Sequence, residues 1–79
     1  LHGFDAEVVE VLAAPGAPIT KIPLSRIDPS FHGKILIGGV YREGHWEVAV
    51  GDTRIQPRER AIVFCKSMHL RDVHRLFLK

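Results

Sequence analysis

The residues best able to do chemistry include one aspartate in a tight turn. Asp52 lies in the stretch Gly51-Asp52-Thr53, between two runs of β-forming residues. A catalytic carboxyl group needs a partner within hydrogen-bond reach. The nearest candidates along the chain are His45 and Arg54, and neither spacing matches a known catalytic arrangement. We therefore interpret Gly51, Asp52 and Thr53 as a structural turn in which Asp52 accepts backbone N–H hydrogen bonds.

The histidines and the single cysteine show no metal-binding or nucleophilic pattern. A zinc site needs converging ligands, such as two helical histidines four residues apart or a pair of cysteines. His69 and His74 are five residues apart, which places them on different faces of a helix. Cys65 follows Phe64 in an apolar run, where a core thiol is favoured over a reactive one. We expect no metal, no cofactor and no enzymatic activity, and we interpret all five histidines as isolated surface residues: His2, His32, His45, His69 and His74.

Two glycines inside a β-branched run are more informative. Gly38 and Gly39 interrupt residues 34–42, where glycine is unfavourable unless a bulge is required or a ligand or another backbone comes close. The preceding Phe31-His32-Gly33-Lys34 adds an aromatic ring, an imidazole and an ammonium group. Two interpretations remain open. The favoured one is a loop followed by a strand bulge, and the other is a small pocket for an anion or a nucleotide.

Strands must position most of these residues. Residues 5–12, 34–42, 46–50 and 60–66 have the β-branched and aromatic content of strands, with Trp46, Val48 and Val50 on one face. A hairpin turn is predicted at residues 42–45, and further turns at 51–52 and 56–59, on either side of a short extended piece at 53–55.

Two helical segments complete the prediction. Pro23 fits the first turn of a short helix in which Leu24 and Ile27 face inward. Apolar residues then recur at helical spacing to the end of the chain, with Ser67 as a plausible N-cap. The apolar residues of this last helix are Leu70, Val73, Leu76 and Phe77, and the residues expected on its outer side are Arg71, Asp72 and Arg75.

The predicted fold class is α+β: a small mixed or antiparallel sheet of about four to five strands with a C-terminal amphipathic helix. Its 79 residues make one small domain, residues 1–79, with 46% hydrophobic content. Such a small sheet has free edges, which a dimer can cover. The chain starts at Leu1, so we expect it to be part of a longer protein. It has no apolar run of the ~20 residues that a membrane-spanning helix needs.

The order of these pieces resembles the TrkA C-terminal domain, which is the second half of the regulator-of-potassium-conductance (RCK) module. The resemblance covers residues 8–77. It rests on the run PGAPITKIPL at residues 15–24, the strand pair around residues 35–42, GDTRI at 51–55, RAIVF at 60–64 and the closing helix.

The sequence also departs from the family pattern. Lys21-Ile22 stands where the family often has Gly-Lys, and Arg58-Glu59-Arg60 stands where it usually has Gly-Asp-Arg. Arg58 predicts that this turn needs no positive φ, or is reshaped. In some branches the loop before the central strand carries an arginine used for cyclic di-AMP. Residues 28–33 contain no arginine, so the resemblance gives no support for that ligand.

The resemblance implies a cytoplasmic regulatory domain of a potassium transport system, lying against the inner face of the membrane. It also implies a homodimer, a membrane potassium transporter or channel as partner through the full-length protein, and a nucleotide-type small ligand. Around the mouth of such a pocket we expect His32, Lys34, Ile35 and Arg42.

The alternative hypothesis is a small β domain that binds nucleic acid. It rests on the basic balance of the chain and on Arg42, Arg54, Arg58 and Arg60. The net charge of +2 is small and the charges are interspersed, which argues against a dedicated nucleic-acid surface.

Overall fold

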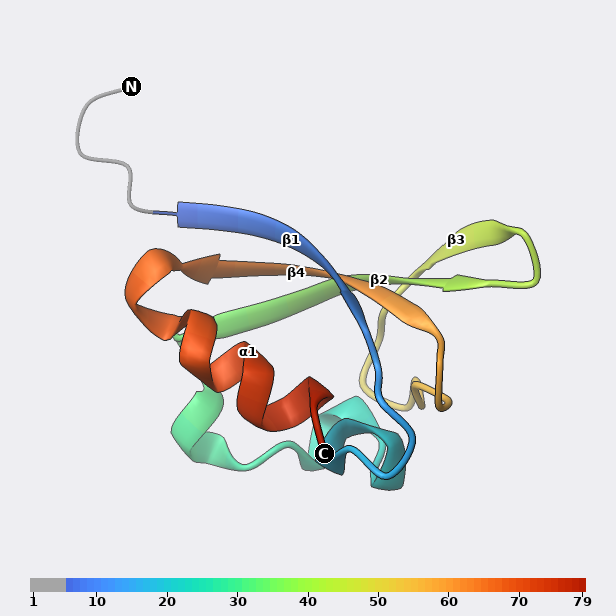
Figure 1. Ribbon diagram of the computed structural model, residues 1–79, viewed down its shortest axis with the longest axis horizontal. Helices are drawn as coiled ribbons and strands as arrows, with labels where there is room; N and C mark the ends of the chain where they lie inside the picture. Colours follow the sequence, from blue (N-terminus) through green and yellow to red (C-terminus); the bar gives the residue numbers. More distant parts are fainter. Residues whose placement is uncertain (1–5) are drawn as a thin grey trace.

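A computed structural model of the chain describes residues 6–79 and shows one sheet covered on one face (Figure 1). The strands are β1 (Ala6–Leu12), β2 (Ile35–Arg42), β3 (His45–Val48) and β4 (Arg60–Lys66). They form a four-stranded antiparallel sheet in the order β1-β4-β2-β3. Helix α1 (Leu70–Phe77) lies below the sheet in Figure 1. These elements confirm the α+β prediction.

The second layer also contains four short 3₁₀ segments. Three of them precede β2, where the sequence predicted a single helical turn, and the fourth follows β4. They are η1 (Pro18–Lys21), η2 (Leu24–Arg26), η3 (Pro29–Phe31) and η4 (Ser67–His69). Prolines at 15, 18, 23 and 29 remove backbone donors and keep this part of the chain from forming a longer helix. Pro23 precedes η2 rather than lying within it. The predicted extended piece at 53–55 contributes only an isolated bridge, between Arg54 and Pro23.

The core lies between the sheet and the second layer. The side chains that α1 contributes to it are Val73, Leu76 and Phe77, of which Phe77 is fully buried. Leu24 and Ile27 are half-buried against the core, in the inward orientation that the sequence predicts. The buried residues of the sheet and the loops are Ala13, Ala17, Ile19, Ile37, Val40, Ile55, Ala61, Val63 and Cys65.

Cys65 is buried, and burial raises the pKa of its thiol, as expected for a core cysteine.

The two glycines of β2 form the predicted bulge. The register of β2 against β4 shifts between Ile37 and Gly39, so Gly38 is the extra residue. A Cβ atom on Gly38 would lie 2.7 Å from Cε2 of Phe64. The glycine therefore makes room for the phenyl ring that lies across it.

The prediction that Ser67 caps the helix is wrong. The N-cap of α1 is His69, which makes no side-chain cap hydrogen bond, and the Ser67 hydroxyl donates instead to Glu7 Oε2 over 2.9 Å. Asp72 is not on the outer side, because its side chain is half-buried and its Oδ2 lies 3.2 Å from Nδ1 of His69. The 3₁₀ turn η4 displaces the start of the helix by three residues.

The turn before β4 also differs from the prediction. Arg58 adopts φ of 71°, so this turn does use a positive φ even though arginine occupies the position. Its N–H donates to Ala13 O over 2.7 Å, which ties the turn to the end of β1. The hairpin between β2 and β3 turns at Glu43 and Gly44, both with positive φ, as a two-residue antiparallel connection requires.

One predicted boundary moves, and one lies outside the described residues. β3 ends at Val48, so Val50 leaves the strand and does not continue the face made by Trp46 and Val48. The predicted first strand included Asp5, which lies outside the described residues, as does His2.

Candidate ligand pocket

One hollow of the described chain lies between the 3₁₀ segments and the start of β2. Its volume is about 270 Å³ and it is open to solvent on one side. Most of its walls are apolar, and the polar side chains at its surface are those of Ser25 and His32. The lining residues are Leu24, Ser25, Ile27, Phe31, His32, Ile35, Leu36, Ile37, Ala49, Val50 and Gly51.

Short backbone hydrogen bonds hold the two walls of this pocket together. The Ser25 N–H donates to Gly51 O over 2.7 Å, and the Leu24 N–H donates to Thr53 O over 3.0 Å. These bonds fasten η2 to the loop that follows β3. The Ala49 N–H donates to Gly38 O over 3.1 Å, so the same loop is also attached to the bulge of β2.

The turn at residues 50–53 shapes the rim of the pocket. The Thr53 N–H donates to Val50 O over 3.0 Å, and the Val50 N–H donates to the Thr53 hydroxyl over 2.9 Å. Gly51 and Asp52 occupy the centre of this turn. Thr53, rather than Asp52, supplies the side-chain hydrogen bond, which differs from the expected role of Asp52.

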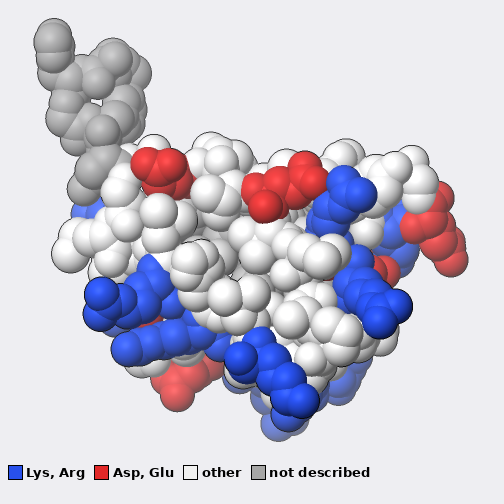
Figure 2. Space-filling view, in the orientation of Figure 1, with Lys and Arg blue, Asp and Glu red and all other residues white. Residues whose placement is uncertain are grey.

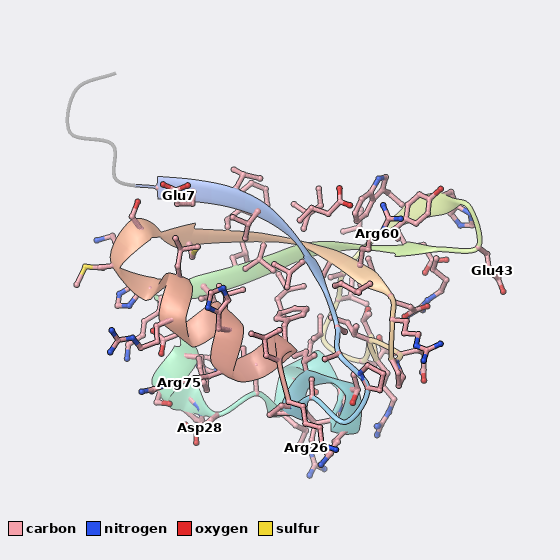
Figure 3. All side chains as sticks on the ribbon, in the orientation of Figure 1. Glu7, Arg26, Asp28, Glu43, Arg60 and Arg75 are labelled. Carbon is pink, nitrogen blue, oxygen red and sulfur yellow. The ribbon has the colours of Figure 1, made fainter. Side chains whose placement is uncertain are left out.

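The mouth of the pocket is formed by η3 and the loop after it. Asp28 precedes η3 and its Oδ1 accepts a hydrogen bond from the Ser30 N–H over 2.8 Å. This hydrogen bond lowers the pKa of Asp28. Figure 3 shows Asp28 and Arg26 on the lower side of the molecule, away from the sheet. The cap fixes the direction of the chain into Phe31 and His32, which line the pocket.

The structure brings some of the sequence-predicted residues together and separates another. His32 and Ile35, two of the residues expected around the mouth of a pocket, are among the lining residues of this one. Lys34 lies beside them but borders an adjoining shallow hollow, which it shares with Ile35 and Lys66. Lys34 and Lys66 are therefore residues of this adjoining hollow and not of the pocket itself.

Arg42 lies at the other end of β2 from Ile35, about 23 Å along the strand at the usual rise per residue. Its Nε and Nη2 each donate to Glu59 over 2.8 Å, and Nη2 also donates to Arg54 O over 2.6 Å. This bidentate pair lowers the pKa of Glu59 and raises that of Arg42. Arg42 is held in place by these partners and does not reach the pocket.

Sequence reasoning missed the contribution of the chain after β3. Ala49 and Val50 were assigned to the strand, and here they form one wall of the pocket. Leu24 and Ile27 were recognised as inward-facing residues but not as pocket residues. No local pattern in the sequence marks this wall, because it forms through backbone hydrogen bonds between η2 and the loop after β3.

The four arginines of the nucleic-acid hypothesis do not form one free basic surface. Arg42 is bound to Glu59, and the Arg60 Nη1 lies 3.1 Å from Glu10 Oε2. Arg54 and Arg58 are exposed. Among residues 6–79, no three His, Cys, Asp or Glu side chains converge as metal ligands would. The described helices are all too short or too polar to cross a bilayer.

The pocket is a mainly apolar concavity with two polar side chains at its surface. Its walls are mainly apolar, and within the described residues the Ser25 hydroxyl and the His32 imidazole make no hydrogen bond to another residue. Both side chains can donate or accept hydrogen bonds at the surface of the pocket. Small-molecule sites in proteins have this composition, a mostly apolar concavity with a few placed polar groups.

Comparison with known proteins identifies the fold. No protein-family model matches the sequence, and no curated protein matches it. Among the solved structures that are similar is one described as "Structure of RCK domain with cda", with a TM-score of 0.69 and 21% sequence identity. The match covers 87% of this chain and 96% of that one. The chain therefore has an RCK-type fold, which confirms the fold expected from the resemblance to the TrkA C-terminal domain.

Proposed function

We propose that this chain is a cytoplasmic regulatory domain that senses a small ligand and dimerises within a potassium or other monovalent-cation transport system. The observation that carries the proposal is a mainly apolar pocket with two polar side chains, Ser25 and His32, at its surface, in a domain of RCK-type fold. In the full-length protein, the domain would pass the state of this pocket to a membrane transporter or channel subunit.

The mechanism is a shift between two arrangements of the pocket walls. η2 and the loop at residues 49–53 meet through two backbone hydrogen bonds, those donated by Leu24 and Ser25. A ligand that contacts both walls favours the arrangement in which they are closed. It can shift the equilibrium only by the difference in its affinity for the two arrangements.

The pocket size limits the ligand. A volume of about 270 Å³ lies just below the ~300–1,000 Å³ of typical ligand sites, so it takes one ring-sized group rather than a whole dinucleotide. We propose that the base or ring of a nucleotide-type ligand enters the apolar part against Ile35. His32 and Lys34 would then meet the phosphate or another anionic group at the mouth.

Thermal unfolding of the chain tests this proposal. The panel contains AMP, ATP, NADH, cyclic di-AMP, K⁺, Mg²⁺ and Ca²⁺. A ligand present at 100 times its dissociation constant adds ~2.7 kcal/mol to the stability. In a domain of this size, that raises Tm by roughly ten degrees or more. We expect at least one nucleotide to produce such a rise, and a flat panel would contradict ligand sensing by this domain.

Paired histidine variants locate the binding. His32→Ala removes a side chain at the mouth of the pocket and is expected to reduce the nucleotide-induced rise in Tm. His74→Ala removes an exposed imidazole from α1, outside this pocket, and should leave the rise unchanged. An equal loss of the rise in both variants would place the ligand elsewhere.

A further inference from the structure

Within residues 6–79, strand β1 forms an open edge of the sheet. It is the terminal strand in the order β1-β4-β2-β3 and pairs with β4 alone. The Ala13 N–H, directly after β1, donates to Glu59 O over 2.9 Å and therefore points toward the side of β4. Successive residues of an edge strand direct their backbone groups to opposite sides, so the N–H and C=O groups of Val8, Glu10 and Leu12 point away from β4. An added strand would form its hydrogen bonds with these groups.

A hollow of about 350 Å³ separates β1 from α1. Val9 and Val11 form the wall on the side of the sheet, where both are partly buried against the core. The opposite wall contains the buried Val73, the partly buried Leu70 and the 48% exposed Leu78. We call this hollow, together with the open edge of β1, the edge groove.

An open strand edge beside an apolar groove is an arrangement that binds extended peptides. In strand addition, main-chain hydrogen bonds to the edge hold the peptide, and pockets receive every second side chain of it. Here the open edge of β1 provides the hydrogen-bonding groups. Val9 and Val11 point to the side of α1, because exposed and half-buried residues alternate along β1. A peptide with apolar residues at alternating positions therefore matches both parts of the edge groove.

The charges of β1 favour a basic peptide. The strand reads AEVVEVL, with two glutamates and no lysine or arginine. Glu10 Oε2 lies 3.1 Å from Arg60 Nη1, but the Glu10 side chain is 48% exposed, so a cation on the open side of β1 can also reach it. Figure 3 shows Glu7 at the start of β1. In Figure 2 acidic groups lie along the upper margin, whereas most basic groups lie over the lower part of the molecule.

The same charges disfavour a second copy of the chain in the edge groove. Two β1 strands side by side would bring the glutamates of both copies onto one strand pair, and like charges opposite each other destabilise a sheet. The whole chain carries a net charge of +2, so a basic peptide is attracted by a local acidic element such as β1 and not by the chain as a whole.

We propose that the edge groove binds an extended basic segment of another protein as an added strand beside β1. Apolar residues of the segment would enter the hollow against Val9, Val11 and Leu78. A basic residue between them would lie next to Glu10, on the face of the sheet away from α1. The edge groove and the ligand pocket share no lining residue, so this inference goes beyond the proposed ligand sensing and does not depend on it.

Fluorescence anisotropy with a labelled peptide tests the proposal. The probe has 7 residues, the length of β1, with arginine and valine alternating. We expect it to bind the chain with a Kd below about 100 µM. One control peptide has the same composition with its valines grouped together, and a second has glutamate in place of arginine. Both controls are expected to bind at least about tenfold more weakly.

Variants at Glu10 separate the backbone contact from the charge. Glu10→Ala and Glu10→Pro both remove the carboxylate, but only proline also removes the N–H that points away from β4. Glu10→Pro is expected to bind the peptide at least about fivefold more weakly than Glu10→Ala, which is the loss expected for one hydrogen bond. Leu78→Gln should also weaken binding, whereas Met68→Gln, at an exposed residue of η4 outside the groove, should leave it unchanged.

Amide hydrogen exchange of the wild type gives a second readout that needs no variant. The peptide should slow exchange at Val8, Glu10 and Leu12 and leave Gly44, at the turn of the β2–β3 hairpin, unchanged. Unchanged exchange at the three β1 amides, no binding of the alternating peptide, or equal binding of all three peptides would overturn the proposal. Protection of these amides that rises with protein concentration without peptide would do the same, because a second copy would then cover the edge. No nucleotide is present, so either failure leaves the proposed ligand sensing unaffected.

Discussion

At the scale of single residues, Gly38 shows how the sheet depends on one missing side chain. The bulge in β2 places Gly38 under the ring of Phe64, where a Cβ atom would come within 2.7 Å of Cε2. Glycine is therefore needed here for space rather than for a positive φ. Gly51 differs, since a Cβ atom there would make an ordinary 3.5 Å contact with the Ser25 Cβ.

We expect Gly38→Ala to lower the free energy of unfolding by about 1 kcal/mol, at the low end of overpacking costs because the half-exposed Phe64 ring can swing away. This corresponds to a fall in Tm of roughly 4–8 °C. Gly51→Ala should change the stability by less than about 0.5 kcal/mol. Thermal unfolding followed by circular dichroism compares the two variants. An equal Tm for both variants would show that the contact between the added Cβ atom and Phe64 does not lower the stability.

At the scale of elements, the turn at residues 56–59 leads from the isolated β-bridge between Arg54 and Pro23 into β4. This turn holds Arg58 in a strained backbone conformation. A left-handed conformation costs a non-glycine residue about 1–2 kcal/mol, and Arg58 adopts φ of 71°. The turn persists because the Arg58 N–H donates to Ala13 O and the Glu59 N–H donates to Gln56 O over 3.1 Å. Tertiary hydrogen bonds thus impose a conformation that the residue type does not favour.

Arg58→Gly should therefore raise the free energy of unfolding by about 0.5–1 kcal/mol, because the relief of strain exceeds the entropy that glycine gains in the unfolded chain. Arg54→Gly makes the same chemical change at an exposed residue without positive φ and should lower the stability by about 0.5–1 kcal/mol. Urea denaturation measures both variants. If Arg58→Gly were as destabilising as Arg54→Gly, the strain at residue 58 would not exist.

At the scale of the whole molecule, the Arg42–Glu59 pair links the end of β2 to the turn before β4 and makes stability depend on pH. Glu59 Oε1 accepts from Arg42 Nη2 and from the Gln56 N–H, each over 2.8 Å. The pair lowers the pKa of Glu59 in the folded state below its unfolded value of ~4.3. Its contribution is therefore complete above the unfolded pKa and is lost as the pH falls through the folded pKa.

Glu59→Gln is expected to lower the free energy of unfolding at pH 7 by about 1–3 kcal/mol, because it removes a charge-assisted bidentate pair. The difference from wild type should shrink as the pH falls through the folded-state pKa of Glu59, because the carboxylate then becomes protonated in both states. Urea denaturation at pH 7, 5 and 3 follows this change. Glu43→Gln is the control, since Glu43 lies at the tip of the β2–β3 hairpin and points away from the molecule in Figure 3. A pH-independent difference would show that the charge of Glu59 plays no part.

The sequence by itself determined the local elements and the fold class. The β-branched runs at β2 and β4, the Gly38-Gly39 bulge and the apolar spacing of α1 are local signals, because side-chain shape and periodicity decide them. Cys65 belongs to the same group, since its place on the inward face of β4 follows from strand alternation. The RCK-type fold was expected from the resemblance of short motifs, in their order along the chain, to the TrkA C-terminal domain.

Only the tertiary structure decided which residues meet. The pocket joins η2, the start of β2 and the loop at 49–51 through hydrogen bonds between distant segments, and no local pattern contains those pairings. Arg42 was expected at the pocket, yet the length of β2 carries it to the other end of the sheet, where Glu59 binds it. The exposed apolar residues on the face of the sheet away from α1 likewise depend on strand order, because Val8, Phe64 and Leu36 become neighbours only when β4 lies between β1 and β2.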